Sequence, residues 1–158
     1  MPAKPQIIAD PQTNRGTAFT IDERKRFGLM GRLPAAVETL EQQAARAYKQ
    51  VCRLDDDLDK YIYLEQLHDR NETLYYKVII DHIAELLPII YDPTIGEAIK
   101  KWSADYRRSR AIYLSVDRVE DVRPTFEGLG LGPDDVDHLV VSDAEQILGI
   151  GDWGVNGT

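Results

Sequence analysis

Apolar residues recur at three- and four-residue intervals through the first two thirds of the chain, which predicts a succession of amphipathic helices. Pro34 suits the first turn of one such helix, because a proline there gives up no helical hydrogen bond. Its inner face would consist of the regularly spaced apolar residues Val37, Leu40, Ala44, Ala47, Tyr48 and Val51.

Polar residues mark where other helices begin. The segments 20–23 (TIDE) and 94–97 (TIGE) have the spacing of capping boxes, in which a threonine side chain and a glutamate side chain each bond a backbone N–H. The acidic run 55–57 and Asn71 suit two further helix N-termini. The helix after Asn71 is expected to continue until Pro88.

The pattern changes after residue 108. Residues 111–116 and 138–141 are rich in β-branched and other apolar side chains and predict two strands, with a short helix over 119–126 between them. The predicted fold class is therefore α/β overall, with an extended arm over 1–19, a mainly helical domain over 20–108 and the first strands of an α/β domain over 109–158. Because two strands make a marginal sheet, we expect this chain to be the front part of a longer protein or a shortened form of one.

Composition excludes several classes of protein. The chain has 158 residues and a net charge of −8, which argues against a nucleic-acid binder. Cys52 is the single cysteine, so an internal disulfide framework and a cysteine-based metal cage are excluded. No apolar run has the length of a membrane span, and the N-terminus lacks the apolar core of a secretory signal. These features favour a soluble protein of the cytoplasm.

A glycine-rich segment is the most conspicuous motif. Residues 149–154 (GIGDWG) fit the spacing G-x-G-x-x-G, which is typical of dinucleotide-binding loops when a strand precedes it and a helix follows. Only four residues follow Gly154, too few for that helix. We therefore interpret the segment as a tight turn near an active-site cleft and expect no nucleotide there.

Tyr91 ends an apolar run and directly precedes Asp92 and Pro93, a turn signal. A phenol at such a point can face a cleft and serve as a general acid. From the pattern alone, a tyrosine packed in the core is the favoured interpretation, because a lone tyrosine in an apolar segment is ordinary.

Six segments, in this order along the chain, are similar to segments of one known family: 14–20 (NRGTAFT), 29–34 (LMGRLP), 39–43 (TLEQQ), 69–74 (DRNETL), 87–96 (LPIIYDPTIG) and 147–152 (ILGIGD). On these segments the chain resembles the N-terminal part of the malic enzyme family. The resemblance covers nearly the whole chain and implies a helical first domain followed by the start of a domain with a parallel sheet.

The resemblance also implies a chemistry. Members of the family oxidise L-malate with NAD or NADP and a divalent Mg or Mn ion, decarboxylate the resulting oxaloacetate and protonate enolpyruvate to pyruvate. Tyr91 would be the general acid of the last step. The family's lysine base, metal ligands and NAD-binding domain lie beyond residue 158, so this chain alone is predicted to bind neither cofactor and to be inactive.

One position departs from the family. Gln146 stands where many members have an arginine that grips a malate carboxylate, and an amide cannot form that charge-assisted pair. Gln146 and Asp152 are the predicted substrate contacts.

Two alternatives remain open at the level of sequence. The sequences of segments 91–95, 142–145 and 149–154 are similar to those of bacterial malolactic enzymes and close bacterial relatives. Malolactic enzymes convert malate to lactate with NAD retained. Members of the family are dimers or tetramers, so a non-catalytic helical module that dimerises through the apolar faces of residues 35–87 is the other alternative.

Overall fold

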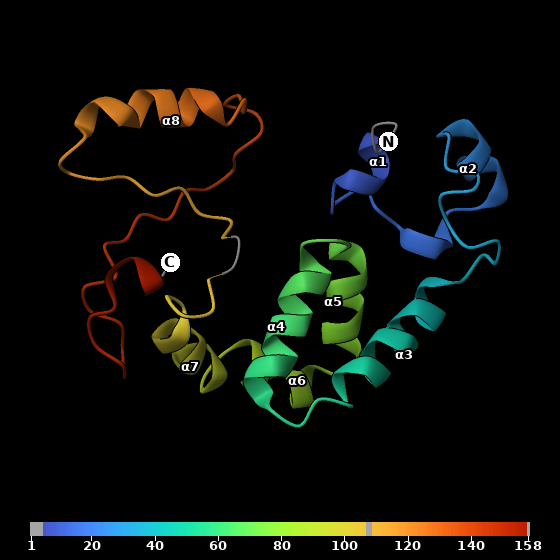
Figure 1. The fold of residues 1–158 in the computed structure, drawn as a ribbon, viewed down its shortest axis with the longest axis horizontal. Helices are drawn as coiled ribbons and strands as arrows, with labels where there is room; N and C mark the ends of the chain where they lie inside the picture. Colours follow the sequence, from blue (N-terminus) through green and yellow to red (C-terminus); the bar gives the residue numbers. More distant parts are fainter. Residues whose placement is uncertain (1–4, 107–108, 158) are drawn as a thin grey trace. The chain divides into compact units, whose positions relative to one another are not determined.

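The chain forms two compact units, the first ending at Ile95 and the second beginning at Gly96. The computed structural model describes residues 5–106 and 109–157 (Figure 1). None of the helices in these ranges combines the length and apolar character needed to cross a lipid bilayer. The predicted domain boundary falls between residues 108 and 109, next to residues 107–108, which lie outside the described residues, and it stays a prediction.

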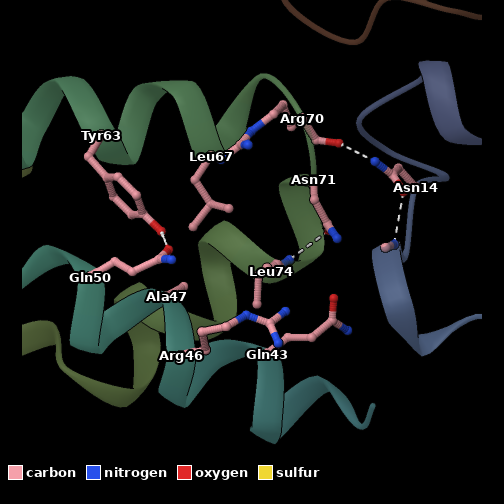
Figure 2. A pocket seen from close by; sticks show the side chains of 11 residues that line it. Asn14, Gln43, Arg46, Ala47, Gln50, Tyr63, Leu67, Arg70, Asn71 and Leu74 are labelled. Carbon is pink, nitrogen blue, oxygen red and sulfur yellow. Dashed lines mark hydrogen bonds between the residues drawn. The ribbon is translucent and has the colours of Figure 1, made fainter. Parts of the chain in front are cut away.

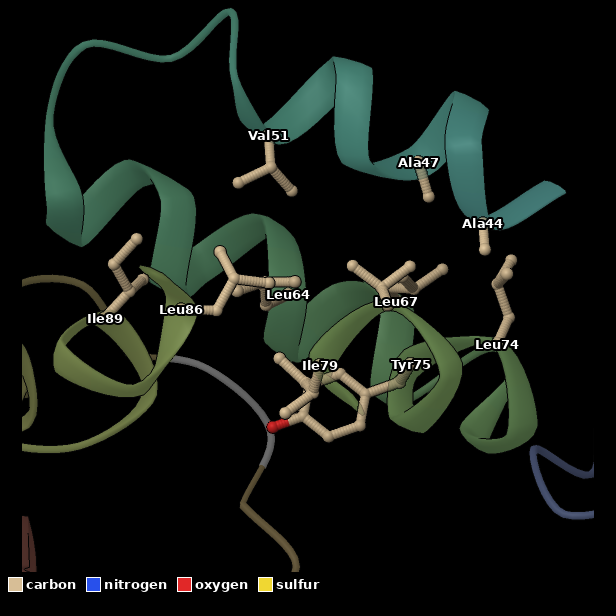
Figure 3. Packing of buried hydrophobic residues seen from close by; sticks show 11 residues of the cluster. Ala44, Ala47, Val51, Leu64, Leu67, Leu74, Tyr75, Ile79, Leu86 and Ile89 are labelled. Atoms are coloured by element: carbon tan, nitrogen blue, oxygen red, sulfur yellow. The ribbon is translucent and has the colours of Figure 1, made fainter. Parts of the chain in front are cut away.

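Four helices build the core of the first unit. They are α3 (Leu40–Val51), α4 (Asp57–His68), α5 (Glu72–Asp81) and α6 (Ile83–Ile90). Figure 3 shows side chains from all four helices directed into one shared interior. This interior contains Ala44, Ala47, Val51, Leu64, Leu67, Leu74, Tyr75, Val78, Ile79, Leu86 and Ile89, all of them buried. The predicted inner face of α3 is therefore confirmed for Ala44, Ala47 and Val51, with Leu40 and Tyr48 packed against this interior.

Side-chain caps fix the start of α3, α4 and α5 and of one shorter helix that precedes them. The predicted box at 20–23 is confirmed and begins α2 (Ile21–Arg26), and Asn71 accepts a hydrogen bond from the Leu74 N–H at 3.0 Å at the start of α5. The predicted start of α3 at Pro34 is wrong. A capping box between Thr39 and Gln42 begins that helix, and Val37 lies outside it and is exposed.

The predicted helix from Asn71 to Pro88 is divided in two. The backbone of His82 is not helical, with φ −130° and ψ 31°, so α5 ends at Asp81 and α6 begins at Ile83. Pro88 lies inside α6 instead of ending the helix before it. The break is therefore a turn at His82, where the sequence has neither a glycine nor a proline.

The predicted extended arm over 1–19 contains two short helical turns. They are α1 (Gln6–Ala9) and the 3-10 turn η1 (Gly16–Ala18). Ile8, Phe19 and Leu29 are buried together in a second small core. These apolar contacts explain why the segment folds back instead of remaining extended.

The second unit contains little regular structure. Helix α7 (Thr94–Lys101) begins two residues before the division between the units, and η2 (Val119–Asp121) with α8 (Val122–Gly128) confirms the predicted helix near 119–126. The 3-10 turn η3 (Gly154–Gly157) follows the glycine-rich segment.

The two predicted strands do not form among residues 5–106 and 109–157, where an isolated bridge between Ile147 and Gly151 is the only β pairing. A strand needs neighbouring backbone to accept its hydrogen bonds, and apolar strand residues need a surface that covers them. Val140 and Val141 instead face solvent, with 83% and 92% of their surface exposed. The α/β prediction is thus supported only in its helical part.

Candidate functional site

Tyr91 lies at the junction between α6 and α7. Its backbone N–H donates to the Leu87 carbonyl at 3.0 Å, and its carbonyl accepts from the Ile95 N–H at 2.9 Å. The Asp92–Pro93 peptide bond is cis. The backbone of Tyr91 is therefore held by hydrogen bonds to both neighbouring helices.

The side chain of Tyr91 is exposed, with 66% of the residue's surface accessible. Leu86 and Ile89 of the apolar run that ends in Tyr91 are buried and anchor α6 to the core, whereas Leu87 is exposed, as Tyr91 is. The interpretation of Tyr91 as a core tyrosine, which the apolar pattern by itself favours, is therefore wrong. The phenol lies where a small molecule can reach it.

The other two predicted site residues flank one turn in the second unit. Ile147 and Gly151 exchange two backbone hydrogen bonds, each 3.0 Å long, so Gln146 and Asp152 lie on the two sides of this bridge. Both residues are exposed. The structure brings these two together, whereas Tyr91 belongs to the first unit.

Glycine makes this turn possible. Gly149 and Gly151 have φ values of +85° and +87°, a backbone conformation that other residues rarely adopt. One carboxylate oxygen of Asp152 accepts a hydrogen bond from the Gly154 N–H at 3.0 Å, which fixes the start of η3. The segment is thus a tight turn, as predicted from the sequence.

The described residues do not fit a dinucleotide or a divalent metal ion. The glycine-rich turn leads into the four-residue 3-10 turn η3, which lacks the aligned N–H groups that a longer α-helix presents to a pyrophosphate. Within residues 5–106 and 109–157, histidine, cysteine, aspartate and glutamate side chains form no group of three that could hold a metal ion. No chemical step can be assigned to either cofactor on these residues.

A polar pocket of about 330 Å³ lies within the first unit, and the sequence did not predict it (Figure 2). Its walls come from the N-terminal segment, α3, α4 and the turn between α4 and α5. The polar residues that line it are Asn14, Gln43, Arg46, Gln50, Tyr63, Arg70 and Asn71. Segments 14–20 and 69–74 each contribute to it, but only tertiary structure shows that they meet.

Hydrogen bonds hold the walls of this pocket in place. The Asn14 side chain donates to the Arg70 carbonyl at 2.7 Å, and the Arg70 Nε donates to the Gln66 carbonyl at 3.1 Å. Arg46 forms an ion pair with Glu38, and this contact lowers the pKa of the Glu38 carboxyl. Two guanidinium groups and several amides make a wall rich in hydrogen-bond donors, which suits a polar or anionic molecule better than an apolar one.

Comparison with known proteins identifies the family. Residues 68–158 match the model of the malic enzyme N-terminal domain. The chain belongs to the malic enzyme family. Tyr91, Gln146 and Asp152 all lie inside the matched range, as does the turn that separates α4 from α5.

Bacterial relatives match almost the whole chain. A Mycobacterium tuberculosis protein named as a malate oxidoreductase that uses NAD is 51% identical over 157 residues, which are 99% of this chain and 29% of the relative. NAD-dependent malic enzyme 3 of Bacillus subtilis is 49% identical over 152 residues, 96% of this chain and 27% of the relative. NAD-dependent malic enzyme of Shewanella pealeana is 46% identical over 160 residues, 98% of this chain and 27% of the relative. The chain therefore spans less than a third of the length of these relatives.

Proposed function

We propose that this chain is the N-terminal, substrate-side part of an enzyme that oxidises L-malate with NAD and decarboxylates it to pyruvate. The observation that carries the proposal is the identity of 46–51% over nearly the whole chain to proteins named as NAD-dependent malic enzymes and as a malate oxidoreductase. The exposed phenol of Tyr91 supports the proposal further, because it is a group within this chain that can give a proton to a substrate.

In this proposal Tyr91 is the general acid of the last step. Once carbon dioxide has left, the enol carbon–carbon double bond of enolpyruvate takes the hydroxyl proton of Tyr91, so that a C–H bond forms and the phenolic O–H bond breaks. The enol hydroxyl loses its own proton to a base, and the ketone of pyruvate results. A phenol is neutral near pH 7, so it still holds the proton that this step requires.

Gln146 and Asp152 are proposed to contact the substrate. Both are exposed, and the bridge between Ile147 and Gly151 holds them on either side of one turn. The amide of Gln146 can donate a hydrogen bond to a carboxylate, although a neutral amide binds it less strongly than an arginine would.

The cofactors and partners are also part of the proposal. The names of the relatives favour NAD over NADP for the complete enzyme, and the resemblance implies a divalent Mg or Mn ion. Because the described residues do not fit either cofactor, we assign both to parts of the enzyme beyond residue 158. We further propose a homo-oligomer, a dimer or tetramer, that works in the cytoplasm.

The test is Tyr91→Phe in the full-length enzyme. The substitution removes the only proton that the side chain can give, so malate turnover should fall by about 10²-fold, a typical effect of losing a general acid. Tyr76→Phe is the matched control, because Tyr76 is another exposed tyrosine of the same unit. Equal turnover in the wild type and in Tyr91→Phe would remove Tyr91 from the mechanism.

The same assay separates the alternatives. Pyruvate as the product supports the proposed malic enzyme, whereas lactate with no net formation of NADH supports a malolactic enzyme. A full-length protein that forms neither product from malate but self-associates would support the non-catalytic helical module.

A further inference from the structure

Three side chains of the first unit meet at the start of α6, and we refer to Tyr48, His82 and Glu85 as the Tyr48 cluster. The Tyr48 and His82 rings are stacked, with centroids 3.4 Å apart and planes 2° from parallel. The Tyr48 hydroxyl donates a hydrogen bond to the Glu85 carboxylate. Tyr48 belongs to α3, whereas His82 precedes α6 and Glu85 lies in its first turn.

The start of α6 has no side-chain cap. His82 occupies its N-cap position and makes no side-chain capping hydrogen bond there. The buried residues Leu86 and Ile89 hold α6 to the core through apolar contacts, which are non-directional and leave rotation and sliding of a helix weakly specified. A hydrogen bond and a parallel stack, in contrast, restrict both distance and orientation.

The ionisation state of the cluster favours this hydrogen bond. The contact with Glu85, together with the nearby Cys52 thiol and burial, raises the pKa of Tyr48, so its hydroxyl keeps the proton that it donates. Lys60 of α4 is close enough to interact electrostatically with both Cys52 and Glu85. The acceptor is therefore a carboxylate that is hydrogen-bonded to a phenol and interacts electrostatically with an ammonium group.

Helix α6 connects the Tyr48 cluster to Tyr91. Glu85 and Tyr91 are six residues apart, about 9 Å along a helix, and the Tyr91 N–H closes the last hydrogen bond of α6 on the Leu87 carbonyl. A shift or rotation at the start of this eight-residue helix therefore moves the residue at its end.

We propose that the Tyr48 cluster positions Tyr91 for proton transfer by fixing α6 against α3. Tyr48 is a positioning residue in this proposal and does not touch the substrate. The proposal rests on the proposed function, because it assigns the cluster to the presentation of a general acid.

The test is a double-mutant cycle in the full-length enzyme with Tyr48→Phe and Tyr91→Phe. Tyr48→Phe keeps the stacked ring and removes the hydrogen bond to Glu85. We expect it to lower kcat about tenfold, because small displacements of a catalytic group are costly, and to change KM less than twofold. In the Tyr91→Phe background the same substitution should change kcat less than twofold, because the group that it positions has been removed.

If Tyr48 only stabilised the fold and did not position Tyr91, the double-mutant cycle would give a different result. Tyr48→Phe would then lower kcat by the same factor in both backgrounds, and this outcome would overturn the proposal. Glu85→Gln provides a second variant should Tyr48→Phe fail to fold, since the amide oxygen still accepts the hydrogen bond. Its loss of kcat should be smaller than tenfold and should also disappear in the Tyr91→Phe background.

Tyr76→Phe serves again as the matched control and should leave kcat unchanged in both backgrounds. Failure of the two proposals can be told apart. If Tyr91→Phe alone leaves kcat unchanged, the proposed function of Tyr91 fails and the positioning role fails with it. If Tyr91→Phe lowers kcat but Tyr48→Phe lowers kcat by the same factor in the Tyr91→Phe background, only the positioning role is overturned.

Discussion

At the scale of single residues, Arg24 is a charged side chain inside the first unit, with 2% of its surface exposed. Its Nε donates to the Phe19 carbonyl at 2.8 Å, its Nη1 to the Pro34 carbonyl at 2.6 Å and its Nη2 to the Thr17 carbonyl at 2.9 Å. Backbone carbonyls thus satisfy a buried guanidinium. A charge on a short polar helix would ordinarily be expected at the surface.

Arg24→Lys should therefore destabilise the chain although the charge is retained. An ammonium group has three donors at one point and cannot reach carbonyls on several sides, as the forked guanidinium does. We expect the free energy of unfolding, measured by urea denaturation, to fall by about 3 kcal/mol. Arg32→Lys is the matched control at an exposed position and should change stability by less than about 0.5 kcal/mol. Equal stabilities of the two variants would contradict the role given to Arg24.

At the scale of elements, local signals identified most helices of the first unit but placed some of their ends incorrectly. The capping box at 20–23 and the cap at Asn71 were recognised, because a cap depends on residues within one turn. The box at Thr39 begins α3, whereas Pro34, the predicted start, lies outside the helix. The turn at His82 has no glycine or proline signal, and the structure shows it stacked on Tyr48, a residue 34 positions earlier in the chain.

Thr39→Ala tests the start of α3. The Thr39 side chain accepts a hydrogen bond from the Gln42 N–H at 3.2 Å, and Gln42 bonds back to the Thr39 N–H at 2.9 Å. Loss of the cap should lower the free energy of unfolding by about 1 kcal/mol, measured by urea denaturation. Thr73→Ala, at an exposed position inside α5, should cause no such loss. Equal effects of the two substitutions would show that the cap does not stabilise α3.

At the scale of the whole molecule, the described residues include the proposed general acid, and among them no three metal-ligating side chains gather at one place. Tyr91 is exposed at the end of α6, and the glycine-rich segment is a turn followed by a short 3-10 turn. The relatives are more than three times as long as the stretch that they share with this chain, and the remaining length is where we assign NAD and the metal ion.

NAD should therefore not stabilise this chain against heat. A ligand that binds only the native state raises the unfolding temperature, by an amount that grows with its concentration relative to Kd. We expect no change in Tm when millimolar NAD is added to residues 1–158, measured by differential scanning fluorimetry, and an increase for the full-length enzyme as the positive control. A clear increase for the chain alone would restore residues 149–154 as a nucleotide-binding loop.

The sequence by itself determined the helical character of the first unit, the positions of several caps, the glycine turn and the family, because each depends on residues that are near one another in the chain. Tertiary structure decided the rest. It placed Tyr91 at the surface instead of in the core, joined residues 14–16 to α3 and to residues 70–71 around a polar pocket, and buried Arg24 among carbonyls. These features arise from contacts between distant segments, and periodicity along a chain does not encode which segments will meet. The strands expected at 111–116 and 138–141 show the same limit, since a strand is completed by neighbouring backbone and not by its own residues.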